Sequence, residues 1–311
     1  MAAQTIGRPI IYREAPLDPI LPWAYSRKRS IIVAVLSDLH SGSSYAPWDS
    51  RYELRSPGSP QSARTIGLTP LQRQLESSWK RFLTWTATLR PNILLLGGDL
   101  VDGSNRHDHG YETIPTNIDD QADCLIPRLE KLLKTCARGC SVYGVRGSGY
   151  HSEQYNDVEK YIVESLGGKY CGVAARLRIA GHRILLTHKI SNAQFYLEQA
   201  AGRTVWLLKL AESDEKLNHN IEVVFTAHLH TYLHLVREWR SNVDKHIVFT
   251  PGWQAQTPFI VTKVSSGAVR VPTIGAAYAV FQEDLPPWIH CIQYPTPVED
   301  EEEIEEATND G

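Results

Sequence analysis

The chain has 311 residues and a formal net charge of −3, and it is 42% hydrophobic and 22% charged. This composition is typical of a globular protein, it excludes a disordered chain, and no apolar run approaches the roughly 18 residues of a membrane span. The N-terminus lacks the basic and apolar segments of a secretory signal. The five cysteines form no CxxC pair. We therefore expect a cytoplasmic protein with reduced cysteines, no disulfide framework and no cysteine zinc site.

The charge is distributed unevenly along the chain. Residues 299–311 contain eight acids and no base, which leaves 32 basic and 27 acidic residues in 1–298, a formal net charge of +5. A basic body fits an anionic substrate, and acidic tails are typically disordered and solubilising. We expect an irregular arm over 1–30, one domain over 31–290 and an acidic, disordered tail over 291–311.

The first half of the chain alternates predicted strands and helices. Apolar strands are expected over 31–36, 92–96 and 141–145, and helices over 70–89, about 119–137 and 153–166. Pro70 at the first helical position and Arg90-Pro91 at the end delimit the first helix, and Asp119 or Asp120 is the expected cap of the second. Residues 41–70 and 103–118 are predicted as loops.

Strands dominate the second half. Strands over 173–180 and 182–187 are expected to form a hairpin through Ala180-Gly181, and 192–217 reads as mostly helical. A strand over 222–227 is followed by strands over 231–239, 246–250, 258–264, 269–272 and 276–281. This order predicts a mixed, layered α/β sandwich.

Four of the apolar strands are followed by carboxylates or imidazoles. These residues are Asp38, His40, Asp99, Asp102, His188, His228 and His230. If the strands are mutually parallel, their carboxyl ends converge on one crevice, and so many charged groups there require a cation. Mixed carboxylate and imidazole donors suit Mn²⁺, Fe²⁺, Zn²⁺ or Co²⁺. Seven candidates are too many for one tetrahedral site, so they favour two metal ions that clamp a phosphate.

The order Asp38-x-His40, Gly98-Asp99-x-x-Asp102, His188 and His228-x-His230 resembles the calcineurin-like metallophosphoesterases over about residues 31–234. The resemblance implies a four-layer α/β/β/α sandwich of two mixed β-sheets flanked by helices. It also implies two divalent transition metal ions, with Mn²⁺ preferred and Fe, Zn, Co or Ni as alternatives. By this resemblance Asp38, His40 and His230 bind the first ion, Asp99 bridges, and His188 and His228 bind the second. Asp102 lies beside the ligands.

One motif departs from the family pattern. The family has Gly-Asn-His-Glu or Gly-Asn-His-Asp after the third strand, whereas this chain has Gly147-Ser-Gly-Tyr-His151. Ser148 stands at the position of the metal-binding Asn, and His151 follows two residues after the position of the catalytic His. This form resembles a divergent branch found in phage-like and archaeal genes. We expect Ser148 to coordinate the second metal and His151 to act as the acid.

Further polar and aromatic residues are candidates for contact with substrate. Tyr150 can stack on a ring, and His107 and His109 lie in the loop after Asp102. The side chains expected at a substrate rim are Tyr45, Trp48, Arg51, Trp253 and Gln254.

The sequence thus predicts a hydrolase in which a metal-bound hydroxide attacks a phosphate ester. A phosphodiester of nucleic acid or a nucleotide is the first choice of substrate, which makes a phosphodiesterase or nuclease. A phosphomonoesterase is one alternative, and a catalytically decayed scaffold that binds a partner is another. No membrane association is expected.

Overall fold

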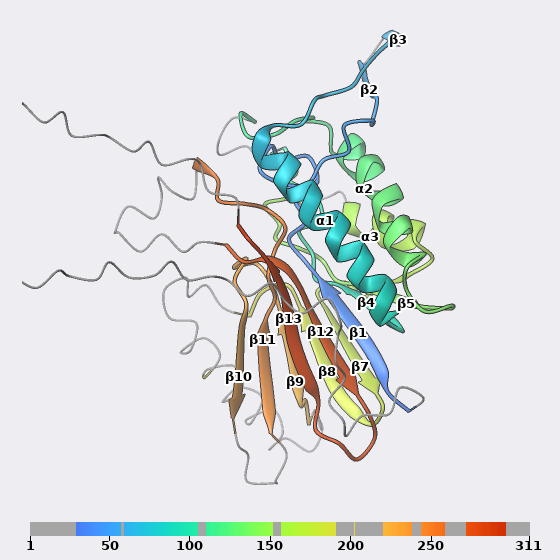
Figure 1. Ribbon diagram of the computed structural model, residues 1–311, viewed down its shortest axis with the longest axis vertical. Coiled ribbons are helices and arrows are strands. Elements are labelled where there is room, and N and C mark those ends of the chain that lie inside the picture. The colour runs from blue at the N-terminus through green and yellow to red at the C-terminus, as the bar shows by residue number, and fades with distance from the viewer. Residues whose placement is uncertain are drawn as a thin grey trace, which may run out of the picture.

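A computed structural model of the chain describes residues 29–56, 59–104, 110–151, 157–190, 202, 220–237, 244–258 and 272–296. Two mixed β-sheets form its centre (Figure 1). The first contains, in spatial order, β13 (Trp288–Tyr294), β12 (Ile274–Phe281), β1 (Ile31–Leu36), β4 (Ile93–Leu96), β5 (Ser141–Gly144) and β6 (Lys169–Tyr170). The second contains β10 (Leu233–Arg237), β11 (Lys245–Phe249), β9 (Val223–Thr226), β8 (His182–Thr187) and β7 (Ala174–Ile179).

The central strands of each sheet run parallel to one another. β1, β4, β5 and β6 are parallel in the first sheet, and β8, β9 and β11 are parallel in the second. Antiparallel pairings complete each sheet: β1 with β12 and β12 with β13 in the first, and β8 with β7 and β11 with β10 in the second. The carboxyl ends of the parallel strands therefore form one edge in each sheet.

Three helices cover the outer face of the first sheet: α1 (Pro70–Leu89), α2 (Ile118–Leu133) and α3 (Val158–Ser165). α1 begins as expected, with Pro70 after a capping box in which Thr69 and Gln72 exchange hydrogen bonds. α2 is capped by Asn117, whose side chain accepts from the Asp119 amide, so the expected cap at Asp119 or Asp120 is wrong. Those two acids instead occupy the first turn, where their negative charges interact favourably with the positive end of the helix dipole.

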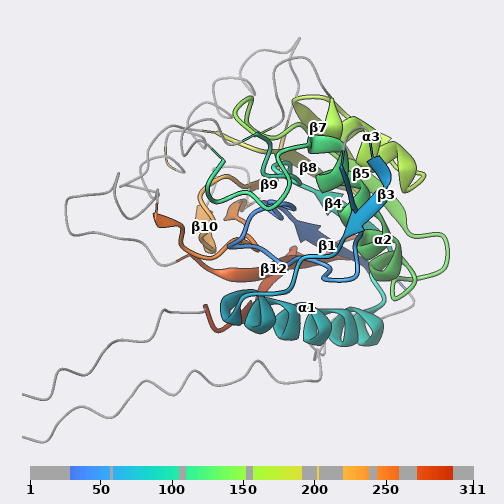
Figure 2. The same ribbon diagram turned by 90° about the horizontal axis from the view of Figure 1, so that it is seen from above.

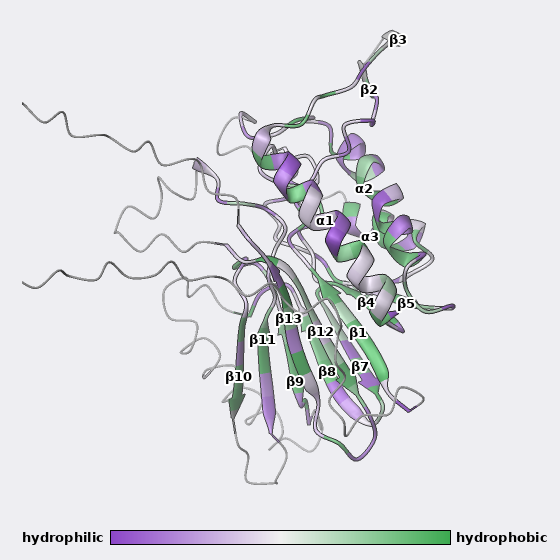
Figure 3. Ribbon diagram, viewed as in Figure 1, coloured by the Kyte–Doolittle hydropathy of each residue, from purple (hydrophilic) through white to green (hydrophobic). Residues whose placement is uncertain are grey.

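Alternate residues of the central strands face two different cores. Ala34 and Leu36 pack against the helices, whereas Val33 and Val35 pack against the second sheet. Figure 2 shows α1 on one side of β1 and β12, with β8 and β9 on the other. Figure 3 shows β1 hydrophobic along its length and α1 alternating between hydrophilic and hydrophobic residues. A strand buried on both faces needs this continuous apolar run.

The prediction of two mixed sheets with flanking helices is confirmed. The described residues make three layers, helix, sheet and sheet. The outer face of the second sheet carries a further apolar cluster around Val224, Ile247 and Phe249. The helical segment expected over 192–217 lies outside the described residues except for 202, as do the expected arm over 1–28, the tail from 297 and residues 259–271.

Some boundaries differ from the expectations. The segment 41–70 contains a hairpin of β2 (Leu54–Ser56) and β3 (Ser59–Arg64) instead of being loop throughout. β13 pairs with β12 as far as Tyr294, beyond the expected domain end at 290. All five cysteines are free. None of the described helices is long and apolar enough to cross a membrane.

One ion pair remote from the strand-end residues makes stability depend on pH. His182 Nδ1 lies 2.7 Å from Glu222 Oε2, and this hydrogen bond raises the pKa of His182 above 6.5. The stabilisation is fully present below pH 6.5 and is lost as pH rises through the folded-state pKa. Glu222→Gln should therefore lower the free energy of unfolding by about 1 kcal/mol at pH 6 and by less at pH 9.

Urea unfolding at both pH values measures this difference. The effect of Glu222→Gln should vanish in a His182→Gln background, which separates this pair from the nearby His246. An equal loss at pH 6 and pH 9 would contradict the assignment.

Candidate metal centre

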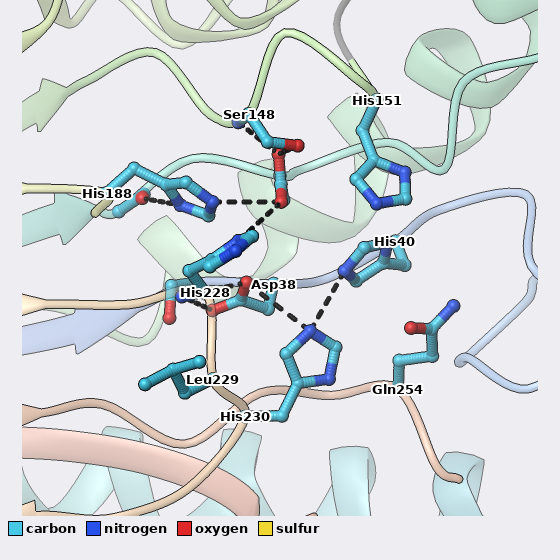
Figure 4. Close-up of polar contacts among 12 residues, drawn as sticks. Asp38, His40, Ser148, His151, His188, His228, Leu229, His230 and Gln254 are labelled. Atoms are coloured by element: carbon cyan, nitrogen blue, oxygen red, sulfur yellow. Dashed lines mark hydrogen bonds and ion pairs between the residues drawn. The ribbon is translucent and has the colours of Figure 1, made fainter. Parts of the chain in front are cut away.

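The candidate ligands lie where the parallel strands of both sheets end. Asp38 and His40 follow β1, Asp99 follows β4, and Ser148 and His151 follow β5. His188 follows β8, and His228 and His230 follow β9. Figure 4 shows the side chains that it labels after β1, β5, β8 and β9 pointing toward one another from both sheets. The candidate ligands therefore gather in one place, as expected, but they come from the carboxyl ends of strands in two packed sheets.

Hydrogen bonds across the sheets hold the two edges together. His188 Nδ1 of the second sheet donates to the Gly97 carbonyl of the first at 2.8 Å. The Ser37 and Thr250 hydroxyls lie 2.7 Å apart. The Trp253 amide donates to the Asp38 carbonyl at 2.9 Å. Because a carbonyl only accepts, Nδ1 of His188 is protonated whether the ring is charged or neutral, and Nε2 faces the centre.

The backbone at the ligands is strained. Eight non-glycine residues of the described chain have a positive φ, and five of them are candidate ligands: Asp38 (50°), His40 (42°), Asp99 (49°), His228 (76°) and His230 (47°). Side chains rarely adopt this conformation, and each instance costs of order 1–3 kcal/mol unless the surroundings enforce it. Such strain concentrated in one cluster indicates a functional site.

Asp38, His40 and His230 form the first group. The Nε2 atoms of His40 and His230 face each other at 3.1 Å, and His230 Nε2 lies 3.4 Å from Asp38 Oδ1. Both Asp38 oxygens also accept from the His228 amide at 3.2 Å. These contacts bring one oxygen of Asp38 and the Nε2 atoms of His40 and His230 close together, although the residues come from two sheets.

Asp99 joins the first group to the second. Its Oδ2 lies 2.9 Å from His188 Nε2 and 4.0 Å from His228 Nδ1. Its Oδ1 accepts from the Ser148 amide at 2.6 Å and from the Ser148 hydroxyl at 3.1 Å. A ring nitrogen of His40 and one of His151 also lie within 4.8 Å of an Asp99 oxygen. The carboxylate therefore stands between histidines of both groups.

Asp102 supports the site without belonging to either group. Its Oδ1 lies 3.1 Å from His40 Nδ1, which leaves His40 Nε2 directed at the centre. The side-chain amide of Gln254 donates to the same oxygen at 3.2 Å, and the Thr113 hydroxyl donates to Asp102 Oδ2 at 3.2 Å. The structure thus places Asp102 behind His40 as an orienting group.

The loop after β5 folds back over the centre. His151 Nδ1 donates to the Asp102 carbonyl at 2.7 Å, and the ring centroids of His151 and His40 are 4.5 Å apart. Tyr150 is 38% exposed and packs edge-on against His151 at 5.1 Å. His151 therefore reaches the centre despite its late position in the sequence.

The electrostatics of the buried cluster favour cations. Burial alone disfavours ionised Asp38, but His230 outweighs it and lowers the pKa of Asp38 to about 2. Burial likewise disfavours charged His188, yet the Asp99 carboxylate raises the pKa of His188 to about 9. Burial and the neighbouring His151 and His230 hold the pKa of His40 well below its usual value. Asp38 and Asp99 thus stay ionised only because positive charge lies beside them.

The donor set fits divalent metal ions. One ligand atom from each residue lies within 4.8 Å of the others in the groups Asp38–His40–His230 and Asp99–His188–His228. Carboxylate oxygens combined with imidazole nitrogens suit Mn²⁺, Fe²⁺, Co²⁺ and Zn²⁺. Each group draws residues from both sheets, so a metal ion in either would tie the sheets together.

Some residues behave differently from the expectations. Trp48 and Trp253 are fully buried and do not form a substrate rim: Trp253 packs on Trp79 and Phe82. Arg51 lies in an exposed ion pair with Asp49. His107 and His109 lie outside the described residues.

The buried acid Glu159, which is 0% exposed, was not among the residues expected at the site. Burial and the charge of Asp99 raise the pKa of Glu159 to about 7. The available signal was its helical spacing from the apolar Ile162 and Val163, which places an acid on the buried face of α3. Thr113 was missed as well, and no local pattern marked it.

Neither a family model nor a curated protein matches this sequence. Among solved structures, the chain is similar to Vps29 of Entamoeba histolytica complexed with zinc, at 12% identity and a TM-score of 0.37, covering 85% of this chain and 99% of that one. It is also similar to an archaeal phosphodiesterase, at 11% identity and a TM-score of 0.38, covering 84% of this chain and 99% of that one. A third similar structure is the E. coli phosphoesterase YfcE, at 15% identity and a TM-score of 0.36, covering 82% of this chain and 90% of that one. Because the sequence identities and TM-scores are this low, the function has to be inferred from this chain's own residues.

Gly147 allows the Ser148 loop to approach Asp99. A Cβ at Gly147 would collide with the Asp99 side chain and backbone and would lie 2.8 Å from Glu159 Oε1, whereas a Cβ at Gly149 would meet nothing within 4 Å. Gly147→Ala should therefore destabilise the fold by about 1–3 kcal/mol and reduce the number of bound metal ions. Gly149→Ala is the matched control.

Thermal unfolding and elemental analysis of both variants, after loading with Mn²⁺, measure these effects. We expect Gly149→Ala to match the parent protein. Equal metal content in all three proteins would show that the approach of this loop to Asp99 does not affect metal binding.

Proposed function

We propose that this chain is a dinuclear metal-dependent phosphoesterase of the calcineurin-like type, acting on a phosphodiester of nucleic acid or a nucleotide. The observation that carries the proposal is the position of Asp99 between two groups of buried ligands from different sheets. In this arrangement one carboxylate can bridge two ions, as phosphoryl-transfer sites with paired metals require.

The residues divide between two ions. Asp38, His40 and His230 would hold the first, His188 and His228 with the Ser148 hydroxyl would hold the second, and Asp99 would bridge. Ser148 Oγ donates its proton to Asp99 Oδ1, which keeps the oxygen lone pairs for a cation. When bound, the ions would supply a nucleophile from water near neutral pH and offset charge on the phosphate.

His151 is placed to protonate the leaving group. Its Nδ1 faces the Asp102 carbonyl, which can only accept, so Nδ1 keeps its proton. Nε2 is then the atom that gives a proton to the departing oxygen and is later reprotonated. The Asp102 carbonyl thus fixes both the tautomer and the ring orientation of this acid.

Loss of the bridging carboxylate should abolish catalysis. Asp99→Asn is expected to bind fewer than two ions per chain and to lose at least about 10³-fold in turnover of bis-p-nitrophenyl phosphate with Mn²⁺. Asp49→Asn, which changes a carboxylate paired with Arg51, is the control. Elemental analysis and release of p-nitrophenol measure the two effects.

The same assay tests the alternatives. Faster cleavage of p-nitrophenyl phosphate than of the diester would favour a phosphomonoesterase. The decayed-scaffold alternative rests on Ser148 and Gly149, which replace an amide and an imidazole. Fewer than one bound ion per chain and no turnover in the parent protein would favour that scaffold and contradict the proposed activity.

The role of His151 predicts a dependence on the leaving group. His151→Gln should lower turnover of a dinucleotide by about 10²–10⁴-fold, because its alkoxide leaving group needs a proton. Turnover of bis-p-nitrophenyl phosphate should fall much less, because nitrophenolate departs without one. Equal losses on both substrates, measured as kcat, would assign His151 to metal binding instead.

A further inference from the structure

A cavity of about 470 Å³ adjoins the second group of ligands. Its lining includes Arg146, Ser148, Val173, Thr187, His188 and Lys189. Ser148 and His188 belong to the candidate centre, so the cavity opens directly beside it. The other lining residues lie at the ends of β5 and β8 and just before β7.

The charge of the cavity is opposite to that of the centre. Arg146 and Lys189 line it, and no acid appears among its described lining residues. The centre beside it contains the buried carboxylates Asp38, Asp99 and Asp102. A cavity walled by two cations next to a phosphate-processing centre is complementary to a second anionic group.

The backbone holds the cationic wall in place. The Arg146 amide donates to the Gly172 carbonyl at 2.8 Å, which ties the end of β5 to the segment before β7. Val173, the next residue of that segment, leaves 75% of its surface exposed. Lys189 is exposed and directly follows the buried His188. The cavity therefore offers two cations and an apolar contact on one side of the centre.

The cavity and His151 lie beside different parts of the centre. Figure 4 shows His188 on one side of Ser148 and His151 on the other, and His188 lines the cavity whereas His151 is not among its described lining residues. In an in-line displacement the retained ester group occupies an equatorial position on phosphorus, at about a right angle to the departing oxygen. A leaving group beside His151 is therefore compatible with a retained group that extends toward Arg146 and Lys189.

We propose, resting on the phosphoesterase function above, that this cavity binds a second phosphate on the retained part of the substrate. The substrate is then a diester whose retained nucleoside carries a further phosphate. The volume falls within the 300–1,000 Å³ range of small-molecule sites and exceeds what one phosphate needs. The remaining space fits the sugar and base, with Val173 as their apolar contact.

Binding of product mimics tests the subsite without turnover. Thymidine 3′,5′-bisphosphate and thymidine 5′-monophosphate differ only in the second phosphate, and their affinities for the Mn²⁺-loaded protein can be compared by calorimetry. We expect the bisphosphate to bind about tenfold or more tightly. This advantage should fall toward onefold in Arg146→Gln and in Lys189→Gln. Arg178→Gln, which changes an exposed cation on β7 outside the cavity lining, should retain it.

Two outcomes would overturn the proposal, and they differ from failure of the phosphoesterase function. Equal affinity of the parent protein for the two nucleotides would exclude a second-phosphate subsite. An advantage unchanged by Arg146→Gln and Lys189→Gln would place the subsite elsewhere. In both cases Asp99-dependent cleavage of bis-p-nitrophenyl phosphate, which has no second phosphate, would still support the activity. Loss of that cleavage as well would refute both.

Discussion

The structure depends on how the buried charge at Asp38 and Asp99 is compensated. Both carboxylates are almost fully excluded from solvent, and burial of ionised groups is costly unless opposite charge lies close by. Positive charge comes from imidazoles of both sheets, since His188 and His230 of the second sheet face Asp99 and Asp38 of the first. The two sheets must therefore pack with their carboxyl edges aligned. The apolar core between them, around Val33, Val35 and Phe225, is compatible with that alignment.

The close approach of the ligands strains the backbone locally. Five candidate ligands adopt positive φ, and Gly147 and Gly252 lie so close to ligand side chains that a Cβ at either would press on them. Hydrogen bonds such as those from His188 to Gly97 and from Trp253 to Asp38 fix the strained turns. Strain held by a rigid frame keeps donor atoms close before any ion arrives, which lowers the ordering cost of binding.

Much of this arrangement is predictable because its signals are local. Continuous apolar runs mark strands buried on both faces, and a carboxylate or imidazole after each run marks the converging edge, so Asp38, Asp99 and His188 could be found from sequence. Features that depend on distant contacts could not. Nothing near Thr113 or Gln254 indicates that they hold Asp102. Trp48 and Trp253 sit in polar segments typical of a rim, yet tertiary packing buries both.

Backbone and side-chain contacts together fix the position of Ser148 beside Asp99. Ser148 donates hydrogen bonds to Asp99 from both its amide and its hydroxyl, so the loop after β5 is held by the Asp99 carboxylate rather than by a long side chain. The small glycines beside it let Asp99 approach on one side and leave open space on the other. That space continues into the cavity walled by Arg146 and Lys189. Ser148 contacts Asp99 and also lines the cavity, so one short side chain lies at the boundary between the centre and the cavity.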